Sequence, residues 1–432
     1  MKRFRSIIHY TLKGLLPLML MYSCNKDVQQ FPDTTHTDTT SQPALAAAIA
    51  ADANYSLYNE VIKKSGYADT LNNKKTTFTL FVPTNAAVKT AVSLLTGGQI
   101  QANYPDAVFV GFIQSASFPA ATANGLVKYN TVPQNVDLAM LSATSLNIQY
   151  PTMINPAPNI SALARLTTFL SKTSAFSYVN NVPVTGAKVT AGNGVYYPTG
   201  AVVMPPQRLL WQRISEATDL TYLKAAVIRA DSGLNATDSK NPAKSMVALL
   251  SSFGPNITLF APTDSAFKAG LYQLFYPTVW ANIYTQAKSL MPDAMAKVYA
   301  DANAPGQTNA LVGSPAVFSN PMLYPVLTAT TVKGLLAYHI IGATYFTNNF
   351  PATATSIPTL LSLALGAAAP QLTLTAAFAG PSVAGLTVKG AANGSAANVK
   401  INPLPEPNGS SDQFYVNGTL NKIDQILLPQ SF

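Results

Sequence analysis

Charged residues are scarce in this chain. Asp, Glu, Lys and Arg make up 10% of its 432 residues, whereas a typical soluble domain carries about 25%. The formal charge of +9 includes Lys2, Arg3, Arg5 and Lys13, which lie in a segment that we expect to be removed. Without these four, 23 basic residues stand against 18 acidic ones, a net charge of +5. No cluster of Lys and Arg interleaved with aromatic residues occurs, so we predict no nucleic-acid partner.

Cysteine and histidine are also nearly absent. Cys24 is the only cysteine, so no disulfide can form within the chain. One histidine, His339, follows the first 42 residues, which excludes Cys-His nucleophile pairs and multi-histidine metal sites there. No G-x-S-x-G elbow occurs. We therefore predict no metal, no cofactor and no catalytic residue, with folds held by core burial alone.

The first residues carry a targeting signal. A basic start is followed by an apolar stretch from Gly14 to Met21, and Ser23 stands before Cys24. This order resembles a bacterial lipoprotein signal, whose cysteine becomes the lipidated first residue of the mature chain. The apolar stretch is shorter than the roughly 20 residues of a spanning helix. We expect residues 1–23 to be a signal peptide, Cys24 to carry the lipid, and the chain to be a surface-exposed outer-membrane lipoprotein of the cell envelope.

Residues 24–42 form a polar segment that is rich in Thr and Asp. Such a segment cannot bury enough apolar surface to offset the entropy of ordering it. We predict a flexible tether between the lipid and the folded part of the chain. His36 lies in this tether without partner ligands for a metal.

One motif occurs twice after the tether. TLFVPTN runs from Thr79 to Asn85, and TLFAPTD runs from Thr258 to Asp264. The alternation of apolar and other residues in each predicts a half-buried strand, which the proline ends because it has no N–H to donate. Thr84 and Thr263 are then natural helix N-caps. Each unit is predicted to be a strand followed directly by a helix.

Two further landmarks recur in the same order. Tyr129–Asn130 corresponds to Tyr338–His339, and Asn193–Gly194 corresponds to Asn417–Gly418. The Asn-Gly pairs predict tight turns before a closing strand, because both residues tolerate positive φ. The first copy departs from the second in three places, with Asn130 for His339, Gly200 for Asp424, and Tyr197 and Pro198 interrupting the closing strand.

These landmarks together resemble the fasciclin-like (fasciclin I) domain family in tandem, as in a Bacteroidota-like surface lipoprotein. The resemblance implies an α+β fold, with each domain a twisted β-sandwich or wedge with packed helices. We assign residues 43–208 to a divergent first domain and residues 209–430 to a second domain that is closer to the family pattern. The motif positions that the resemblance marks as structural or binding residues are Thr84, Asn85, Tyr129, Asn130, Asn193, Gly194, Thr263, Asp264, Tyr338, His339, Asn417, Gly418 and Asp424.

The second domain contains an insertion at about residues 276–325, which we predict to hold one or two helices. Insertions lie on surfaces and often carry binding specificity. Its aromatic residues are predicted either to stack on sugar rings or to pack the helices onto their own domain; they are Tyr276, Trp280, Tyr284 and Tyr299. A later apolar stretch from Ile357 is broken by Pro358 and Pro370, which favours buried strands over a membrane span.

The function predicted from these features is adhesion or binding of an extracellular protein or polysaccharide, by a protein held to the membrane through its N-terminal lipid. A low-charge, Thr- and Asn-rich surface suits polar glycans. One alternative is an accessory lipoprotein of an outer-membrane glycan-uptake system. A second is a glycan hydrolase with a carboxylate site, since 18 acidic residues are present. The sequence does not fix the ligand, the leaflet or the oligomeric state.

Overall fold

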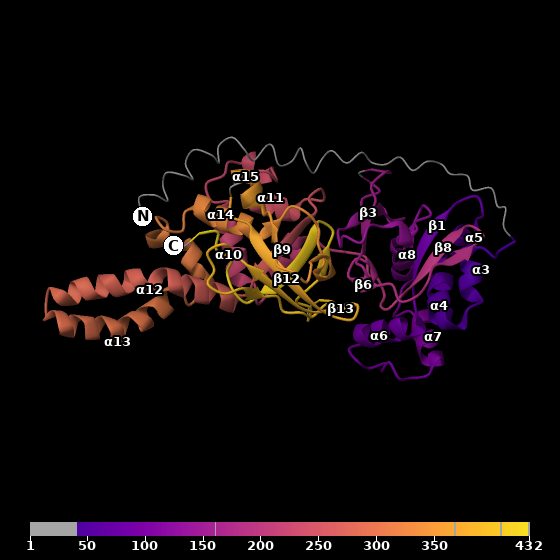
Figure 1. Cartoon of the computed structure of the whole chain (residues 1–432), viewed down its shortest axis with the longest axis horizontal. Helices are drawn as coiled ribbons and strands as arrows, with labels where there is room; N and C mark the ends of the chain where they lie inside the picture. The colour runs from indigo at the N-terminus through magenta and orange to yellow at the C-terminus, as the bar shows by residue number, and fades with distance from the viewer. Residues whose placement is uncertain (1–40, 160, 367–368, 407, 431–432) are drawn as a thin grey trace. The chain divides into compact units, whose positions relative to one another are not determined.

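The computed structural model describes residues 41–159, 161–366, 369–406 and 408–430 (Figure 1). The chain folds into two compact units that part between Pro206 and Gln207; we call them domain 1 and domain 2. The signal segment, Cys24 and nearly all of the tether lie outside the described residues. Among the helices that are described, none has the length and apolar character needed to cross a membrane.

Domain 1 begins with helices, continues with strand β1 and three more helices, and ends in a series of strands. Its helical segments are α3 (Leu45–Ala50), η1 (Ala53–Tyr55), α4 (Ser56–Ser65), α5 (Ala68–Asn72), α6 (Asn85–Leu95), α7 (Asp106–Gln114), α8 (Ala120–Tyr129) and η2 (Leu138–Met140). Its strands are β1 (Phe78–Pro83), β2 (Thr131–Val132), β3 (Ile148–Pro151), β4 (Thr167–Lys172), β5 (Ser177–Val179), β6 (Val182–Pro183), β7 (Val189–Ala191) and β8 (Gly194–Thr199).

Domain 2 repeats this order with two longer helices. Its helical segments are α9 (Leu210–Glu216), α10 (Thr221–Ala230), η3 (Asp238–Lys240), α11 (Met246–Ser251), α12 (Asp264–Lys288), α13 (Asp293–Leu311), η4 (Pro315–Ser319), η5 (Pro321–Leu323), α14 (Ala329–Tyr338), η6 (Thr347–Asn349) and α15 (Leu360–Leu365). Its strands are β9 (Ile257–Pro262), β10 (Ile340–Ile341), β11 (Thr355–Ile357), β12 (Leu372–Ala379), β13 (Ser382–Lys389), β14 (Ala397–Asn398), β15 (Gln413–Tyr415) and β16 (Gly418–Ile423).

Each domain contains two four-stranded sheets in the same arrangement. The first sheet has the order β2-β1-β8-β7 in domain 1 and β10-β9-β16-β15 in domain 2. Its two central strands are parallel in both domains, with Phe78 opposite Gly194 and Ile257 opposite Gly418. The second sheet has the order β3-β4-β5-β6 or β11-β12-β13-β14. The chain therefore has an α+β fold that consists of two tandem domains with one topology.

The TLF strands are buried on both faces, which corrects the prediction that they are half-buried. All six residues of β1 and all six of β9 are buried. In domain 2, Ile257 and Leu259 pack into the core formed with the helices, whereas Phe260 belongs to the core formed with the second sheet. An alternation of apolar and other residues predicts a strand with one exposed face. Here helices cover one face of the strand and the second sheet covers the other.

The closing strand of domain 1 is continuous, so the prediction that Tyr197 and Pro198 interrupt it is wrong. Strand β8 pairs with β1 in parallel from Gly194 to Thr199, with Pro198 opposite Val82. Its antiparallel neighbour β7 pairs with β8 only as far as Tyr196. Pro198 thus lies beyond the end of β7, where its missing N–H breaks no ladder to that strand.

The inserted segment of domain 2 forms a helical hairpin. Helix α12 begins directly after the β9 motif and continues to Lys288 with Pro277 inside it, and α13 packs along it. Figure 1 shows the two helices side by side, extending away from the sheets of domain 2. The later apolar stretch that was expected to form strands is helical in its first part, since α15 covers Leu360–Leu365 before strand β12 begins at Leu372.

Candidate functional site

The threonine of each TLF motif begins a helix. Thr84 accepts a hydrogen bond from the backbone N–H of Ala87 at 3.3 Å, and Thr263 accepts one from Ala266 at 3.4 Å. The backbone of both threonines is extended, as expected of N-cap residues. These hydroxyls satisfy N–H groups at the starts of α6 and α12 that would otherwise lack a partner.

The next residue, Asn85 or Asp264, caps a different helix. The backbone N–H of Leu57 donates to Asn85 Oδ1 at 3.0 Å, and that of Tyr222 donates to Asp264 Oδ1 at 2.9 Å. Asp264 Oδ2 also accepts from the hydroxyl of Thr221 at 2.6 Å. This motif residue therefore joins the start of one helix to the start of another, which is a framework role.

The tyrosine of the second landmark is completely buried in both domains. Tyr129 donates its hydroxyl hydrogen to the carbonyl of Thr167 at 3.1 Å, and Tyr338 donates to that of Gln371 at 2.8 Å. Burial raises the pKa of both phenols above the ordinary value. Each tyrosine therefore stays neutral. It is the last residue of its helix, and its hydroxyl ties α8 to strand β4 or ties α14 to the residue before strand β12.

His339 is buried, with both ring nitrogens engaged. The backbone N–H of Leu427 donates to Nε2 at 2.9 Å, so Nε2 must be the unprotonated nitrogen. Nδ1 then carries the hydrogen and donates to the carbonyl of Leu335 at 2.8 Å. Burial lowers the pKa of His339 to about 4. A neutral imidazole with no free nitrogen and no exposed surface is a packing element.

Asn130 occupies the same position in domain 1 and makes comparable bonds. Its Nδ2 donates to the carbonyl of Leu126, four residues earlier, at 2.9 Å. The same nitrogen donates to the carbonyl of Val203 at 2.9 Å, in the segment that follows the closing strand. An amide thus links the helix to the C-terminal segment as the imidazole does in domain 2.

The asparagine of each Asn-Gly pair anchors the first helix of its domain. The N–H of Leu45 donates to Asn193 Oδ1 at 2.8 Å, and that of Leu210 donates to Asn417 Oδ1 at 3.0 Å. The following glycine has φ of 144° at Gly194 and 148° at Gly418, a region that favours glycine. In contrast to the prediction, the asparagine is not among the residues with positive φ. It stabilises the domain through its buried side-chain amide, which accepts from the first helix.

Asp424 follows the last strand of domain 2. Its Oδ1 accepts from the backbone N–H of Asn398 at 2.7 Å, and its Oδ2 accepts from Asn398 Nδ2 at 2.9 Å. In domain 1 the equivalent residue is Gly200, whose own N–H donates to the carbonyl of Pro183. The motif positions are thus engaged in hydrogen bonds or turns of their own domain.

The aromatic residues of the insertion do not form one exposed face. Tyr276, Trp280 and Tyr284 pack against the small core of the helical hairpin. The rings of Trp280 and Tyr284 stack with centroids 5.1 Å apart, and Trp280 Nε1 donates to Asp301 at 2.7 Å. Tyr299 differs from them, since it is 49% exposed on α13. The packing alternative thus describes the first three residues better than sugar stacking does.

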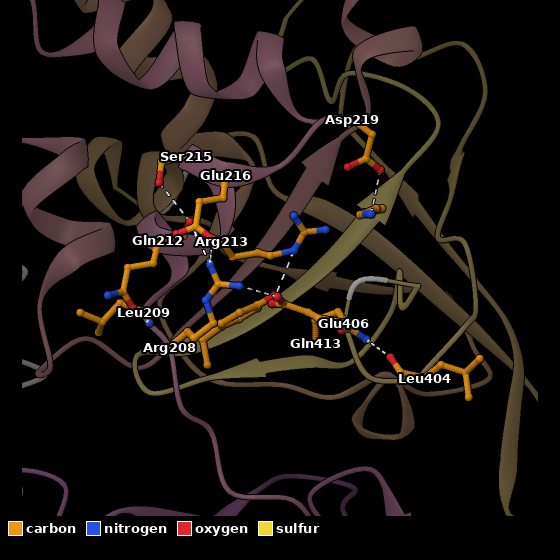
Figure 2. Close-up of polar contacts among 12 residues, drawn as sticks. Arg208, Leu209, Gln212, Arg213, Ser215, Glu216, Asp219, Leu404, Glu406 and Gln413 are labelled. Carbon is orange, nitrogen blue, oxygen red and sulfur yellow. Dashed lines mark hydrogen bonds and ion pairs between the residues drawn. The ribbon is translucent and has the colours of Figure 1, made fainter. Parts of the chain in front are cut away.

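A network of charged groups that sequence analysis missed lies beside α9. Figure 2 shows Arg208 and Arg213 directed toward Glu406. Arg208 NH1 is 2.8 Å from Glu406 Oε2, and Arg213 Nε is 3.5 Å from Oε1. The hydroxyl of Tyr415 donates to the same carboxylate. The two arginines lie close together in the sequence, but Arg208 and Glu406 are 198 positions apart, so no local pattern marks the network.

Acidic side chains elsewhere are also committed to local partners. Asp231 accepts from the backbone N–H groups of Met246 and Val247, and Asp219 pairs with Lys422 at 2.7 Å. Within the described part of the chain, no group of three or more His, Cys, Asp or Glu residues is arranged to hold a metal ion.

Domain 1 has a hollow of about 350 Å³ between the start of α6 and the loop after β6. It is lined by Asn54, Tyr55, Thr84, Asn85, Ala86, Thr185, Gly186 and Pro198. Thr84 and Asn85 are already hydrogen-bonded within the framework. Thr84 and Asn85 could therefore bind a ligand only by giving up the hydrogen bonds with which they cap α6 and α4.

Domain 2 has a shallow hollow of about 410 Å³ where α12 and α13 leave the domain. It is lined by Ser265, Lys268, Ala269, Tyr272, Gln273 and Asn309. The α12 residues recur every three or four positions and so share one face of the helix. No described residue forms a hydrogen bond or ion pair with the side chains of Lys268, Gln273 or Asn309. Three polar side chains beside the ring of Tyr272 are thus available to a polar ligand.

The fold and the motif bonds define a pair of α+β domains that repeat one framework. Residues 53–205 match the model of the fasciclin domain family. Among solved structures, a FAS1 domain pair from the insect cell adhesion molecule fasciclin I shares 13% identity, with 87% of this chain and 97% of that chain covered and a TM-score of 0.31. No curated protein matches the chain. Domain 2 lies outside the matched residues, and it repeats the strand order and the motif bonds of domain 1.

Proposed function

We propose that this chain is a lipid-anchored protein of the cell envelope that presents two fasciclin-like domains for adhesion, with a polar glycan as the ligand of domain 2. The main support is the hollow beside α12, where Lys268, Gln273 and Asn309 have no described partner and lie beside the ring of Tyr272, which itself stacks on Tyr276. Stacking of a sugar on an aromatic ring, together with a few hydrogen bonds, suits such a shallow surface.

Glycan binding is tested with the purified chain from residue 25 onward, which keeps every described residue. Binding to dextran, xylan and polygalacturonate is measured by calorimetry. We expect Tyr272→Ala and Asn309→Ala each to weaken binding to the preferred polymer about 5- to 10-fold, the loss of about one hydrogen bond or ring contact. Gln273→Ala should weaken binding to a similar degree, whereas its matched control Gln286→Ala, at an exposed position of the same helix, should leave binding unchanged.

The salt dependence of binding tests the same site. Among the described residues that line the hollow, Lys268 is the single charged one. Binding of a neutral glycan should therefore change little between 50 and 300 mM salt, because screening acts on charge pairs. Binding that survives Tyr272→Ala and Asn309→Ala together, or that falls steeply with salt on a neutral polymer, contradicts the proposal.

Anchoring and surface display are a separate part of the proposal and rest on the Cys24 signal. Protease treatment of intact cells should release fragments of both domains if the chain faces outward. Cys24→Ala should shift the protein from the membrane fraction to the soluble fraction. Release only after the outer membrane is broken would place the protein on the periplasmic side.

A role in glycan uptake requires a transporter encoded beside this gene, and gene neighbourhood tests it directly. The hydrolase alternative is less well supported, because Asp219, Asp231 and Glu406 are held by partners within the fold. We propose that the protein is not an enzyme. Turnover of any of the three polymers that a single Asp or Glu substitution abolishes would overturn this.

A further inference from the structure

The hairpin of α12 and α13 has an unusual distribution of side chains. Small residues of α13 face α12, since Ala296, Ala300, Ala304 and Thr308 are buried at intervals of four. Ala300 and Ala304 pack beside Ile283 and the aromatic residues of α12. The side of α13 that faces its partner helix therefore carries small groups.

The larger apolar side chains of α13 point outward. Met295 is 62% exposed, Val298 is 68% exposed and Tyr299 is 49% exposed, and their spacing of three and four places them on one face. Leu290, in the connection between the helices, is 84% exposed. The outer side of α12 is different, since it presents Thr278, Asn282 and Thr285. The apolar surface is confined to the free end of the hairpin; we call it the apolar tip.

The charges around the apolar tip favour an anionic partner. Asp293 lies 3.3 Å from Lys288 and 2.9 Å from Lys297, and the hydroxyl of Tyr284 donates to it. The next acidic residue, Asp301, lies beyond the last exposed residue of the tip and accepts from Trp280 Nε1 at 2.7 Å. From position 288 to position 299 the tip therefore has two lysines against one carboxylate.

We propose that the apolar tip inserts into the surface of a lipid bilayer, with Lys288 and Lys297 at the level of anionic head groups. Aliphatic side chains without hydrogen-bonding groups, a tyrosine and flanking lysines are the combination found at membrane interfaces. The exposed apolar residues are limited to the end of the hairpin, so the tip enters the surface and does not cross the bilayer. This goes beyond the proposed adhesion.

The lipid anchor adds to this inference but does not carry it. Ser41 follows Cys24 by 17 positions, and a segment of this length spans at most about 60 Å when fully extended. A chain anchored at Cys24 would therefore keep the start of domain 1 within this distance of the bilayer, and insertion of the tip would be an intramolecular event. The experiment uses the chain without the lipid, so that a failure of the tip and a failure of the anchor give different results.

The test is co-sedimentation of the chain from residue 25 onward with vesicles of phosphatidylethanolamine and phosphatidylglycerol at a 3:1 ratio. We expect the triple variant Leu290→Asn, Met295→Gln, Val298→Thr to bind at least tenfold more weakly, because burial of apolar area in the interface drives insertion. The control is Met322→Gln, an 86% exposed methionine outside the hairpin, which should bind as the parent does. Circular dichroism should show the same helix content in all three proteins.

Salt separates insertion from surface adsorption. In 0.5 M salt the parent should keep much of its binding, whereas Lys288→Gln with Lys297→Gln should weaken binding at low salt only. Equal sedimentation of the parent and the triple variant overturns the proposal. So does concentration-dependent dimerisation of the parent that the triple variant loses without any vesicle binding, since the apolar tip would then be an interface between two copies of the chain.

Discussion

Domain 1 and domain 2 close the same junction with different side chains. The junction between the helix that precedes β2 or β10 and the C-terminal segment of the domain is closed by Asn130 in domain 1 and by His339 in domain 2. Both side chains donate to the carbonyl four residues earlier, and both reach the C-terminal segment. The position requires a buried polar side chain with this reach, and a titratable group is not needed there.

The two domains also differ at the motif residue that joins the starts of two helices. This residue is the neutral Asn85 in domain 1 and the acidic Asp264 in domain 2. Asp264 accepts from a hydroxyl and from an N–H, whereas Asn85 accepts from an N–H and also donates to Ser56 and to the carbonyl of Ala53. Domain 2 thus uses a histidine and a carboxylate where domain 1 uses two amides. Burial lowers the pKa of His339, so this residue gives domain 2 a pH response that Asn130 cannot give domain 1.

The largest expected effect tests what the domains have in common. An alanine side chain at Gly418 would overlap the carbonyl oxygen of Ile257, and one at Gly194 would overlap that of Phe78. Both glycines also have a φ that other residues rarely adopt. We expect Gly418→Ala and Gly194→Ala each to destabilise its own domain by more than about 4 kcal/mol, as measured by urea unfolding.

Gly394→Ala is the control, because no atom lies within 4 Å of the side chain it would add. It should change stability by less than about 1 kcal/mol. If Gly418→Ala lowers the stability of both domains equally, the two domains do not unfold as separate units.

The second prediction separates the domains by pH. The unfolded His339 takes up a proton near pH 6.5, whereas in the folded domain burial lowers its pKa to about 4. Between these values the unfolded state binds more protons, so the stability of domain 2 falls as the pH is lowered from about 6.5 to 4. The loss attributable to His339 is on the order of 3 kcal/mol.

His339→Asn copies domain 1 and should remove this part of the pH dependence. The measurement is the free energy of unfolding of both proteins from pH 7 to pH 4, with domain 1, which has no histidine, as the internal reference. A parallel decline of parent and variant over this range would show that another group controls the acid sensitivity.

The smallest expected change in the free energy of unfolding comes from exchanging Asp264 and Asn85 for one another's residue type. Asp264→Asn keeps an acceptor for Tyr222 and should cost less than about 1 kcal/mol, whereas Asp264→Ala should cost about 1–2 kcal/mol. Asn85→Asp should cost more than Asp264→Asn, because a carboxylate cannot donate to the carbonyl of Ala53. Unfolding in urea gives these differences. Equal costs for the two exchanges would mean that this carbonyl finds another donor.

Much of the framework could be predicted from the repeated motifs. A strand, a proline and a threonine cap are local features, and the structure has β1, α6, β9 and α12 where the motifs place them. Burial of the strands was predicted incorrectly, because Thr79 and Thr258 resemble solvent-facing residues. In the structure their hydroxyls donate to the carbonyls of Gln134 and Ala343, residues far away in the sequence. No local pattern predicts these bonds.

The candidate site could not be predicted in the same way. The hollow of domain 2 requires Lys268 and Asn309 to meet, and they meet only because α13 turns back along α12. The aromatic residues of the insertion had the spacing of a helix face, and that spacing could not distinguish a sugar platform from the inside of a hairpin. Contact between distant segments decided both questions.

The parallel pairing of the first and last strands has a consequence for how each domain is made. Phe78 pairs with Gly194, and Ile257 pairs with Gly418, so neither central sheet can close before its final strand has been synthesised. Contacts between such remote partners slow folding, and until its final strand is made each TLF segment is an unpaired, aggregation-prone strand. A chaperone that binds apolar extended segments would therefore have two separate targets in this chain.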